Sequence, residues 1–105
     1  MFKSYMNIAL QEAESAADLG EIPVGAVIVS AKGEVIAKAS NRTRALNDPS
    51  AHAEMLAIRA ACARLGQERL EGYDLFVTLE PCAMCAGVIS AARTRRLYYG
   101  ASDPK

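Results

Sequence analysis

The sequence predicts an α/β fold of three layers, in which helices cover both faces of a central sheet. Three observations support this. Helical and strand-like segments follow one another in the order α-β-β-α-β-α-β, the strand candidates are short apolar runs, and no internal repeat or low-complexity segment interrupts the order. The chain has 105 residues, and about half of them are apolar. Residues 1–105 therefore suit one compact domain.

The first half of the chain predicts one helix and a hairpin. Apolar residues recur at helical spacing over residues 2–19, and Gly20 supplies a stop. Residues 25–30 (GAVIVS) are apolar and rich in β-branched side chains, and residues 34–40 (EVIAKAS) alternate in character after the short turn at 31–33. Two such runs joined by a tight turn favour a β-hairpin.

The middle of the chain predicts a polar loop and a second helix. Residues 41–49 are polar and end in Asn-Asp-Pro, which is typical of a loop. Ser50 is a favourable N-cap, and the helical pattern from His52 continues to Gly66, a favourable C-terminal residue. We therefore expect Ser50 to cap a helix that starts with His52.

The last third predicts a strand, a helix and a final strand. Residues 74–78 (DLFVT) form a short apolar run, and residues 95–102 (RRLYYGAS) are a second strand candidate. Between them, Glu80-Pro81 is expected to introduce a helix through Ala92, with Pro81 in the first turn, where a missing N–H is tolerated.

The charge of the chain is balanced. Twelve basic and twelve acidic residues give a formal net charge of zero, so no global field favours nucleic acid or an anionic membrane. Any RNA contact must therefore be local. Two groups of arginines could contact phosphates, although such groups are more often solvated surface. They are Arg42 and Arg44, and Arg93, Arg95 and Arg96.

Two short motifs carry the chemistry. His52-Ala53-Glu54 begins one predicted helix, and Pro81-Cys82-Ala83-Met84-Cys85 begins another. Cysteines three apart at a helix start lie on roughly one face and can bind the same ion, and one imidazole completes a set of three ligands. Three protein ligands leave zinc an open position for water, whose pKa the metal lowers to about 7. The positive end of each helix dipole also favours thiolate over thiol.

Glu54 is placed for a different task. It follows His52 by two residues and so projects from another side of the same turn, within reach of a water at the metal. A carboxylate beside an activated water can act as general acid and base. The sequence therefore predicts a hydrolytic zinc site with ligands His52, Cys82 and Cys85 and a catalytic Glu54.

Each motif residue also has a simpler interpretation when taken alone. The C-x-x-C pair could be a redox pair, His52 could be an ordinary helix-start residue, and Glu54 could only favour the helix dipole. The metal could also be purely structural, although structural zinc sites generally have four protein ligands. The joint occurrence of H-x-E and P-C-x-x-C favours catalysis. Cys62 lies among alanines inside the second helix and is interpreted as a small core residue.

The chain resembles a known family over most of its length from Ile22 onward. H-x-E followed by P-C-x-x-C is the signature of zinc deaminases. IPVGAVIV, SNRT, NDPSAHAEMLAIRAA, LFVTLEPCAMCAGVIS and LYYGASDPK resemble the bacterial tRNA-specific adenosine deaminases, within the cytidine deaminase-like superfamily. The resemblance implies a single zinc deaminase domain of the CMP/dCMP type over residues 1–105, with a central mixed sheet. It also implies a further strand and C-terminal helices, which would begin after Lys105.

The resemblance further implies a reaction and its partners. It implies one Zn²⁺ per chain and deamination of the wobble adenosine of a tRNA anticodon to inosine, by water activated at zinc that attacks C6 of the purine. The partner would be the anticodon stem-loop, the enzyme would be a homodimer, and no membrane would be involved. A cytoplasmic location is expected, because the first twenty residues contain no run suited to a signal peptide or a membrane span. Deamination of a free base or nucleoside, such as guanine or cytidine, remains the alternative.

Four residues match substrate contacts of that family. Asn41 would hydrogen-bond the nucleotide, Val24 and the backbone of Ala53 would line the base pocket, and Asp103 would contact RNA. Without the resemblance, Asn41 would be read as a turn residue, Val24 as core and Asp103 as a loop residue beside Pro104.

Overall fold

The computed structural model describes residues 2–100 and has the predicted order of elements. The helices and strands are α1 (Phe2–Asp18), β1 (Gly25–Ser30), β2 (Val35–Ser40), α2 (Ala53–Leu65), β3 (Tyr73–Val77), α3 (Ala83–Ala92) and β4 (Arg96–Tyr99). Every predicted helix and strand is present, with ends that differ by a few residues. Gly66 adopts the left-handed conformation (φ 66°) at the end of α2, as expected of a C-terminal glycine.

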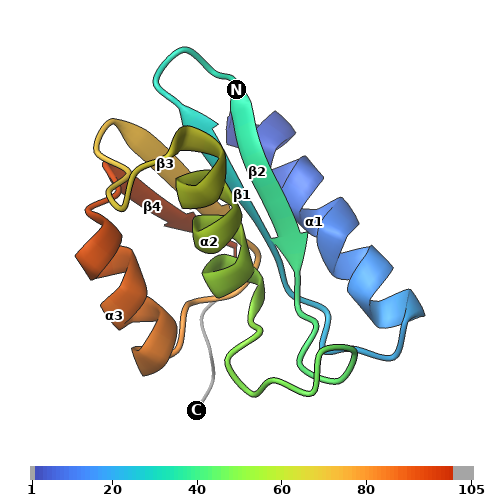
Figure 1. The fold of residues 1–105 in the computed structure, drawn as a ribbon. Helices are drawn as coiled ribbons and strands as arrows, with labels where there is room; N and C mark the ends of the chain where they lie inside the picture. Colours follow the sequence, from blue (N-terminus) through green and yellow to red (C-terminus); the bar gives the residue numbers. More distant parts are fainter. Residues whose placement is uncertain (1, 101–105) are drawn as a thin grey trace.

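The sheet is mixed, in the order β2-β1-β3-β4. β1 pairs antiparallel with both β2 and β3, whereas β4 pairs parallel with β3. The parallel pair is connected through α3, as a parallel crossover requires. Figure 1 shows α1 on one face of the sheet and α2 and α3 on the other. The predicted three-layer arrangement is confirmed.

The core is divided in two by the sheet. Alternate residues of β1 point to opposite faces, so Ala26 and Ile28 pack with α2 and α3, whereas Val27 and Val29 pack with α1. All four side chains are buried. The near-continuous apolar run of β1 therefore reflects a strand covered on both faces.

Gly25 lets α1 approach the start of β1 at backbone distance. A Cβ on Gly25 would overlap the carbonyl oxygen of Ala9 and would lie 2.7 Å from the backbone nitrogen of Ala13. No side chain larger than hydrogen fits here without displacement of the helix. Close packing of α1 on β1 thus depends on this residue.

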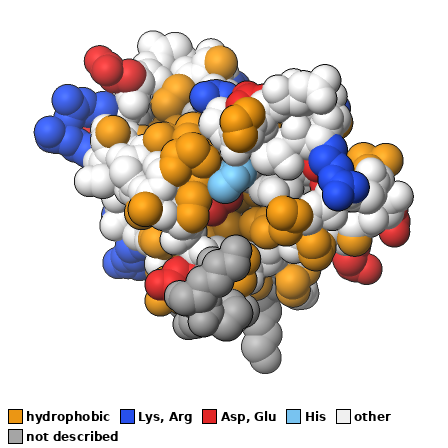
Figure 2. All heavy atoms as spheres, turned by 90° about the horizontal axis from the view of Figure 1, so that it is seen from below, with side chains coloured by type: hydrophobic (Ala, Val, Ile, Leu, Met, Phe, Trp, Pro, Cys, Tyr) orange, Lys and Arg blue, Asp and Glu red, His pale blue; other side chains and the backbone are white. Residues whose placement is uncertain are grey.

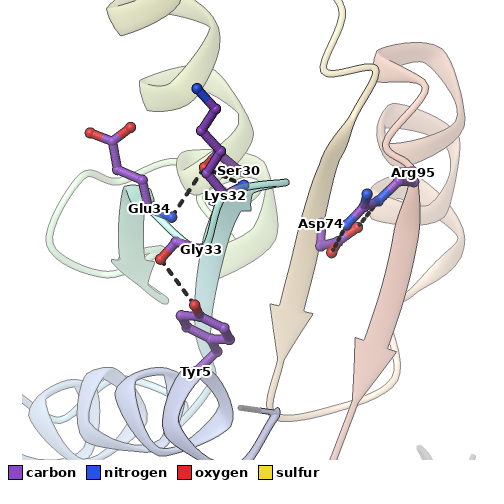
Figure 3. Close-up of polar contacts among 7 residues, drawn as sticks. All are labelled: Tyr5, Ser30, Lys32, Gly33, Glu34, Asp74 and Arg95. Atoms are coloured by element: carbon purple, nitrogen blue, oxygen red, sulfur yellow. Dashed lines mark hydrogen bonds and ion pairs between the residues drawn. The ribbon is translucent and has the colours of Figure 1, made fainter.

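Polar contacts join the elements at one end of the sheet (Figure 3). The Tyr5 hydroxyl donates to the carbonyl of Gly33 at 2.9 Å, which attaches the β1–β2 turn to α1. The Arg95 guanidinium donates to both carboxylate oxygens of Asp74, at 3.0 and 2.8 Å, just before β4 begins. One of the arginines considered for phosphate contact therefore pairs with a carboxylate of its own chain.

Two sequence expectations about helix starts are wrong. Ser50 does not cap α2, because its hydroxyl donates to Asp48 Oδ1 at 2.7 Å inside the loop, and His52 occupies the N-cap position. Pro81 does not lie in the first turn of α3, because that helix begins at Ala83 with Cys82 at the N-cap. Both helices start one to two residues later than the sequence signals suggest, which places metal-ligand candidates at the caps.

Candidate metal and catalytic site

The candidate site lies where the starts of α2 and α3 meet. His52 is the N-cap residue of α2, Cys82 is the N-cap residue of α3, and Cys85 lies in the first turn of α3. Neither cap residue makes a side-chain capping hydrogen bond, so both side chains are available for other contacts. Figure 2 looks onto this end of the molecule and shows the histidine at the base of a hollow bordered by hydrophobic side chains.

The three predicted ligands are close enough to share one ion. Nδ1 of His52 lies 3.6 Å from Sγ of Cys82 and 3.5 Å from Sγ of Cys85. Zinc–sulfur bonds of about 2.3 Å and a zinc–nitrogen bond of about 2.0 Å, at a tetrahedral angle, place sulfur and nitrogen about 3.5 Å apart. The arrangement therefore has the dimensions of a tetrahedral zinc site, and its one nitrogen and two sulfurs are donors that zinc prefers.

The ligand group contains three members within the described part of the chain. Among residues 5–100, the cluster of closely spaced metal-ligand side chains consists of His52, Cys82 and Cys85, without a fourth member. Structural zinc sites generally have four protein ligands, whereas catalytic sites have three and an open position. The structure brings the three predicted ligands together, and a set of three is the number typical of catalytic zinc sites.

The surroundings of Cys85 oppose ionisation of its thiol when no metal is bound. Burial raises the pKa of the Cys85 thiol far above its ordinary value, and the neighbouring Glu54 and Cys82 raise it further. A thiolate here would be desolvated and close to other negative charge, and these effects act against the thiolate-favouring helix dipole. A divalent cation at the site would favour the thiolate over the thiol. Metal binding is therefore expected to release the Cys85 proton.

Glu54 is buried beside the ligand group. Its side chain is 4% exposed, and burial raises the pKa of its carboxyl group, although His52 and hydrogen bonds, including one with Cys85, lower it in part. A raised pKa means that this carboxyl group holds a proton more readily than an exposed one. The role of Glu54 as general acid and base stays a prediction.

Asn41 holds the start of α2. Its Oδ1 accepts a hydrogen bond of 2.9 Å from the N–H of Ala53, the first residue of the helix, and both residues are buried. Asn41 therefore accepts a hydrogen bond from the first turn of α2, the role expected of Ser50, although Asn41 lies twelve residues before the helix. The predicted contact of Asn41 with substrate stays a prediction, as does the pocket-lining role of the Ala53 backbone.

A cavity of about 190 Å³ adjoins the ligand group. Val24 and Asn41, both expected to be near substrate, are among its lining residues, together with His52, Cys82 and Glu54. The cavity is also lined by three residues that the sequence analysis did not single out: Ile22, Leu79 and Glu80. The sequence offered one signal for these residues, which is that they lie close to residues already singled out. Ile22 is two residues before Val24, and Leu79 and Glu80 directly precede Pro81.

Two further residues of the sequence analysis remain, Asp103 and Cys62. Asp103 lies outside the described residues. Cys62 is half-buried and packs against the core that α2 and α3 share, in agreement with its interpretation as a small core residue. Over residues 2–100, no helix is long and apolar enough to cross a membrane.

Comparison with known proteins agrees with this geometry. Two curated relatives are tRNA-specific adenosine deaminases, from Agrobacterium fabrum (63% identical) and from Aquifex aeolicus (50% identical), each matched over 96% of this chain. The chain spans 66% of the length of either relative. The resemblance found in the sequence is confirmed.

Solved structures show the same fold. A structure from a study of A-to-I editing by tRNA:A34 deaminases at the wobble position of transfer RNA is 62% identical, with a TM-score of 0.95, over 98% of this chain and 74% of that one. The guanine deaminase of Bacillus subtilis is 40% identical, with a TM-score of 0.92, over 95% of this chain and 64% of that one.

The family match covers nearly the whole chain. The pattern that defines the zinc-binding region of cytidine and deoxycytidylate deaminases matches residues 2–101. This range includes His52, Glu54, Cys82 and Cys85 and all the helices and strands described above. The chain therefore belongs to the cytidine and deoxycytidylate deaminase zinc-binding family.

Proposed function

We propose that this chain is the catalytic core of a tRNA-specific adenosine deaminase, which converts the wobble adenosine of an anticodon to inosine. The observation that carries the proposal is the buried Glu54 carboxyl group beside His52, Cys82 and Cys85 at the base of a cavity. The similarity to tRNA-specific adenosine deaminases supports the choice of substrate. Because the chain spans only 66% of those relatives, the substrate and partners are part of the proposal.

The residues of the chain divide the chemistry between them. His52, Cys82 and Cys85 would hold one Zn²⁺, which when bound activates water and acts as a Lewis acid. Glu54 would take a proton from the attacking water and deliver it to the ring nitrogen, and would then help to protonate the leaving amine. Overall, water adds at C6 of the purine, the C6–N bond breaks, and adenosine plus water gives inosine plus ammonia.

The cavity supports action on an extruded base. A base must leave its stack to reach a buried catalytic group, and this is least costly in a single-stranded loop such as the anticodon. We propose that Val24 and the backbone of Ala53 contact the base, that Asn41 hydrogen-bonds the nucleotide and that Asp103 contacts the RNA. Val24 and Asn41 line the cavity, which supports their part of this assignment.

A short RNA hairpin tests the proposal. Zinc-loaded protein is incubated with an anticodon hairpin that has adenosine at the wobble position, and inosine is measured by nucleoside digestion and chromatography. The Glu54→Ala variant is the blank, and a hairpin with the adenosine moved by one position is the substrate control. Inosine formed by the unmodified protein from the first hairpin alone is the expected result. Absence of inosine with one zinc bound per chain would contradict the proposal.

A second candidate is deamination of a free base. The guanine deaminase of Bacillus subtilis has the same fold over this chain, which favours guanine as a substrate to test. Guanine and cytidine are therefore assayed in parallel, for xanthine and uridine. Conversion of either compound without action on the hairpin would favour this alternative.

We also infer that the enzyme acts as a homodimer in the cytoplasm, where its tRNA substrate would be found. The start of α3 leaves small side chains and Met84, which is 40% exposed, uncovered beside the ligand group. This surface would permit close packing of a second copy near the active site. Size-exclusion chromatography with light scattering tests the inference, and a strictly monomeric mass at micromolar concentration would contradict it.

A further inference from the structure

Glu21 is a buried acidic residue that the proposed chemistry does not use. It lies in the connection between α1 and β1, and its side chain is 7% exposed. Its Oε1 accepts a hydrogen bond of 3.1 Å from the backbone N–H of Arg44, and its Oε2 accepts one of 2.8 Å from the backbone N–H of Ala45. Each carboxylate oxygen thus binds one main-chain donor of a loop more than twenty residues away.

No cation neutralises this carboxylate within the part of the chain that the structure describes. The ion pairs found there involve Glu12, Glu34, Asp48 and Asp74, and not Glu21. Burial of a carboxyl group without an ion pair is costly unless hydrogen bonds to the charged form compensate for it. The two N–H donors of the loop supply that compensation, which fixes the position of the loop relative to Glu21.

The fixed segment is a compact turn that begins next to the cavity. The N–H of Leu46 donates to the carbonyl of Arg42 at 3.0 Å, and the N–H of Asp48 donates to the carbonyl of Thr43 at 3.0 Å. At the base of the turn, the N–H of Asn41 donates to the carbonyl of Val24 at 3.1 Å. The α1–β1 connection and the turn are therefore joined at two points, one at the cavity wall and one at Glu21.

The turn displays two cations to solvent. Arg42 and Arg44 directly follow Asn41, which lines the cavity, and both arginine side chains are exposed. Neither belongs to the ion pairs found among the described residues. Exposed arginines beside a base-sized cavity can contact the phosphates that flank an extruded nucleotide, provided that the backbone carrying them is held still.

We propose that Glu21 is a positioning residue for the substrate. Its carboxylate clamps the turn of residues 42–47 so that Arg42 and Arg44 stand at the edge of the cavity, where the phosphates of the RNA pass. This inference rests on the proposed function. Loss of the clamp loosens the turn and weakens substrate binding, while the metal ligands, which belong to the starts of α2 and α3, keep their positions.

Three variants separate positioning from general stability. Glu21→Ala removes both acceptors, whereas Glu21→Gln keeps one acceptor oxygen and turns its amide donor toward the other N–H. Glu14→Ala, at an exposed position of α1, is the matched control. Zinc-loaded proteins are compared by amide hydrogen exchange of Arg44 and Ala45, by zinc content, and by KM and kcat for the wobble-adenosine hairpin.

The expected pattern is specific to the turn. In Glu21→Ala, exchange at Arg44 and Ala45 accelerates at least about tenfold, as expected for loss of hydrogen bonds to a charged group. The KM rises by roughly tenfold, because the loosened turn must be ordered when the RNA binds. The kcat changes by less than about twofold, and zinc stays at one per chain. Glu21→Gln lies between the parent and Glu21→Ala, and Glu14→Ala equals the parent.

Several results would overturn the inference. Unchanged exchange at Arg44 and Ala45 in Glu21→Ala would show that no clamp exists. Lost zinc, or a lower kcat at unchanged KM, would assign Glu21 to the metal site instead. If the parent protein makes no inosine, the proposed function fails. The affinity of the same hairpin is then measured as a Kd by fluorescence anisotropy, in place of KM. An unaltered Kd in both Glu21 variants would then refute positioning even if exchange accelerates.

Discussion

Replacement of Asn41 tests the role of a distant side chain at the start of α2. Asn41 is 5% exposed, and its Oδ1 accepts the N–H of Ala53, which is itself fully buried. Asn41→Ala leaves this buried N–H without its side-chain acceptor. A buried unsatisfied donor costs about 1–3 kcal/mol. For a domain of this size, a loss of about 2 kcal/mol corresponds to a Tm that is lower by roughly 8–16 °C.

Asn41→Asp distinguishes this structural role from a contact with substrate. The aspartate retains an oxygen that can accept the N–H of Ala53, and its negative charge is favourable at a helix N-terminus. We expect its free energy of unfolding to stay within about 1 kcal/mol of the parent. The variant nevertheless lacks the amide N–H donors, so its activity on the hairpin should fall if Asn41 binds the nucleotide.

The assay is thermal unfolding of zinc-loaded protein by circular dichroism, with zinc content measured on the same samples. Asn7→Ala, at an exposed position of α1, is the matched control and should melt with the parent. A Tm of Asn41→Ala within about 2 °C of the parent would refute the reasoning, since that corresponds to less than about 0.5 kcal/mol. Equal destabilisation by Asn41→Asp would also refute it.

Three further predictions concern the catalytic group, the ligands and the packing of α1. Glu54→Gln should retain one zinc per chain and lose activity by about 10²–10⁴-fold, because it removes the proton acceptor; a loss below tenfold, measured as inosine formed per minute, would contradict this. Because the pKa of Cys85 is raised and zinc must displace its proton, zinc affinity should fall as the pH is lowered from about 8 to about 6. Competition with a chelator, corrected for the chelator's own protonation, measures this, and a pH-independent affinity would be the contrary result. Gly25→Ala should destabilise by at least about 1–3 kcal/mol, because its Cβ overlaps the Ala9 carbonyl oxygen. Gly87→Ala is the control, because a Cβ at this exposed position of α3 meets nothing within 4 Å. It should stabilise the protein by about 0.5–1 kcal/mol. Both variants are measured by urea unfolding, and a change of the same sign in both would count against this account.

Local patterns along the chain were enough to predict the order of the helices and strands and the grouping of the ligands. Helical spacing, apolar runs and turn residues predicted the order of elements, because these signals act over a few residues. The ligand set was also predictable. The two motifs each begin a helix, and the joint chemistry of His52, Cys82 and Cys85 implies one shared ion even though thirty residues separate the motifs.

The side chains that support the site from distant segments could be identified only in the folded chain. The cap of α2 comes from Asn41, twelve residues before Ala53, where local preference favoured Ser50. The clamp on the turn comes from Glu21, more than twenty residues before Arg44. The raised pKa of the Cys85 thiol likewise comes from its burial in the folded chain. Hydrogen bonds between distant segments and desolvation arise only when the chain is packed, so no local pattern in the sequence specifies them.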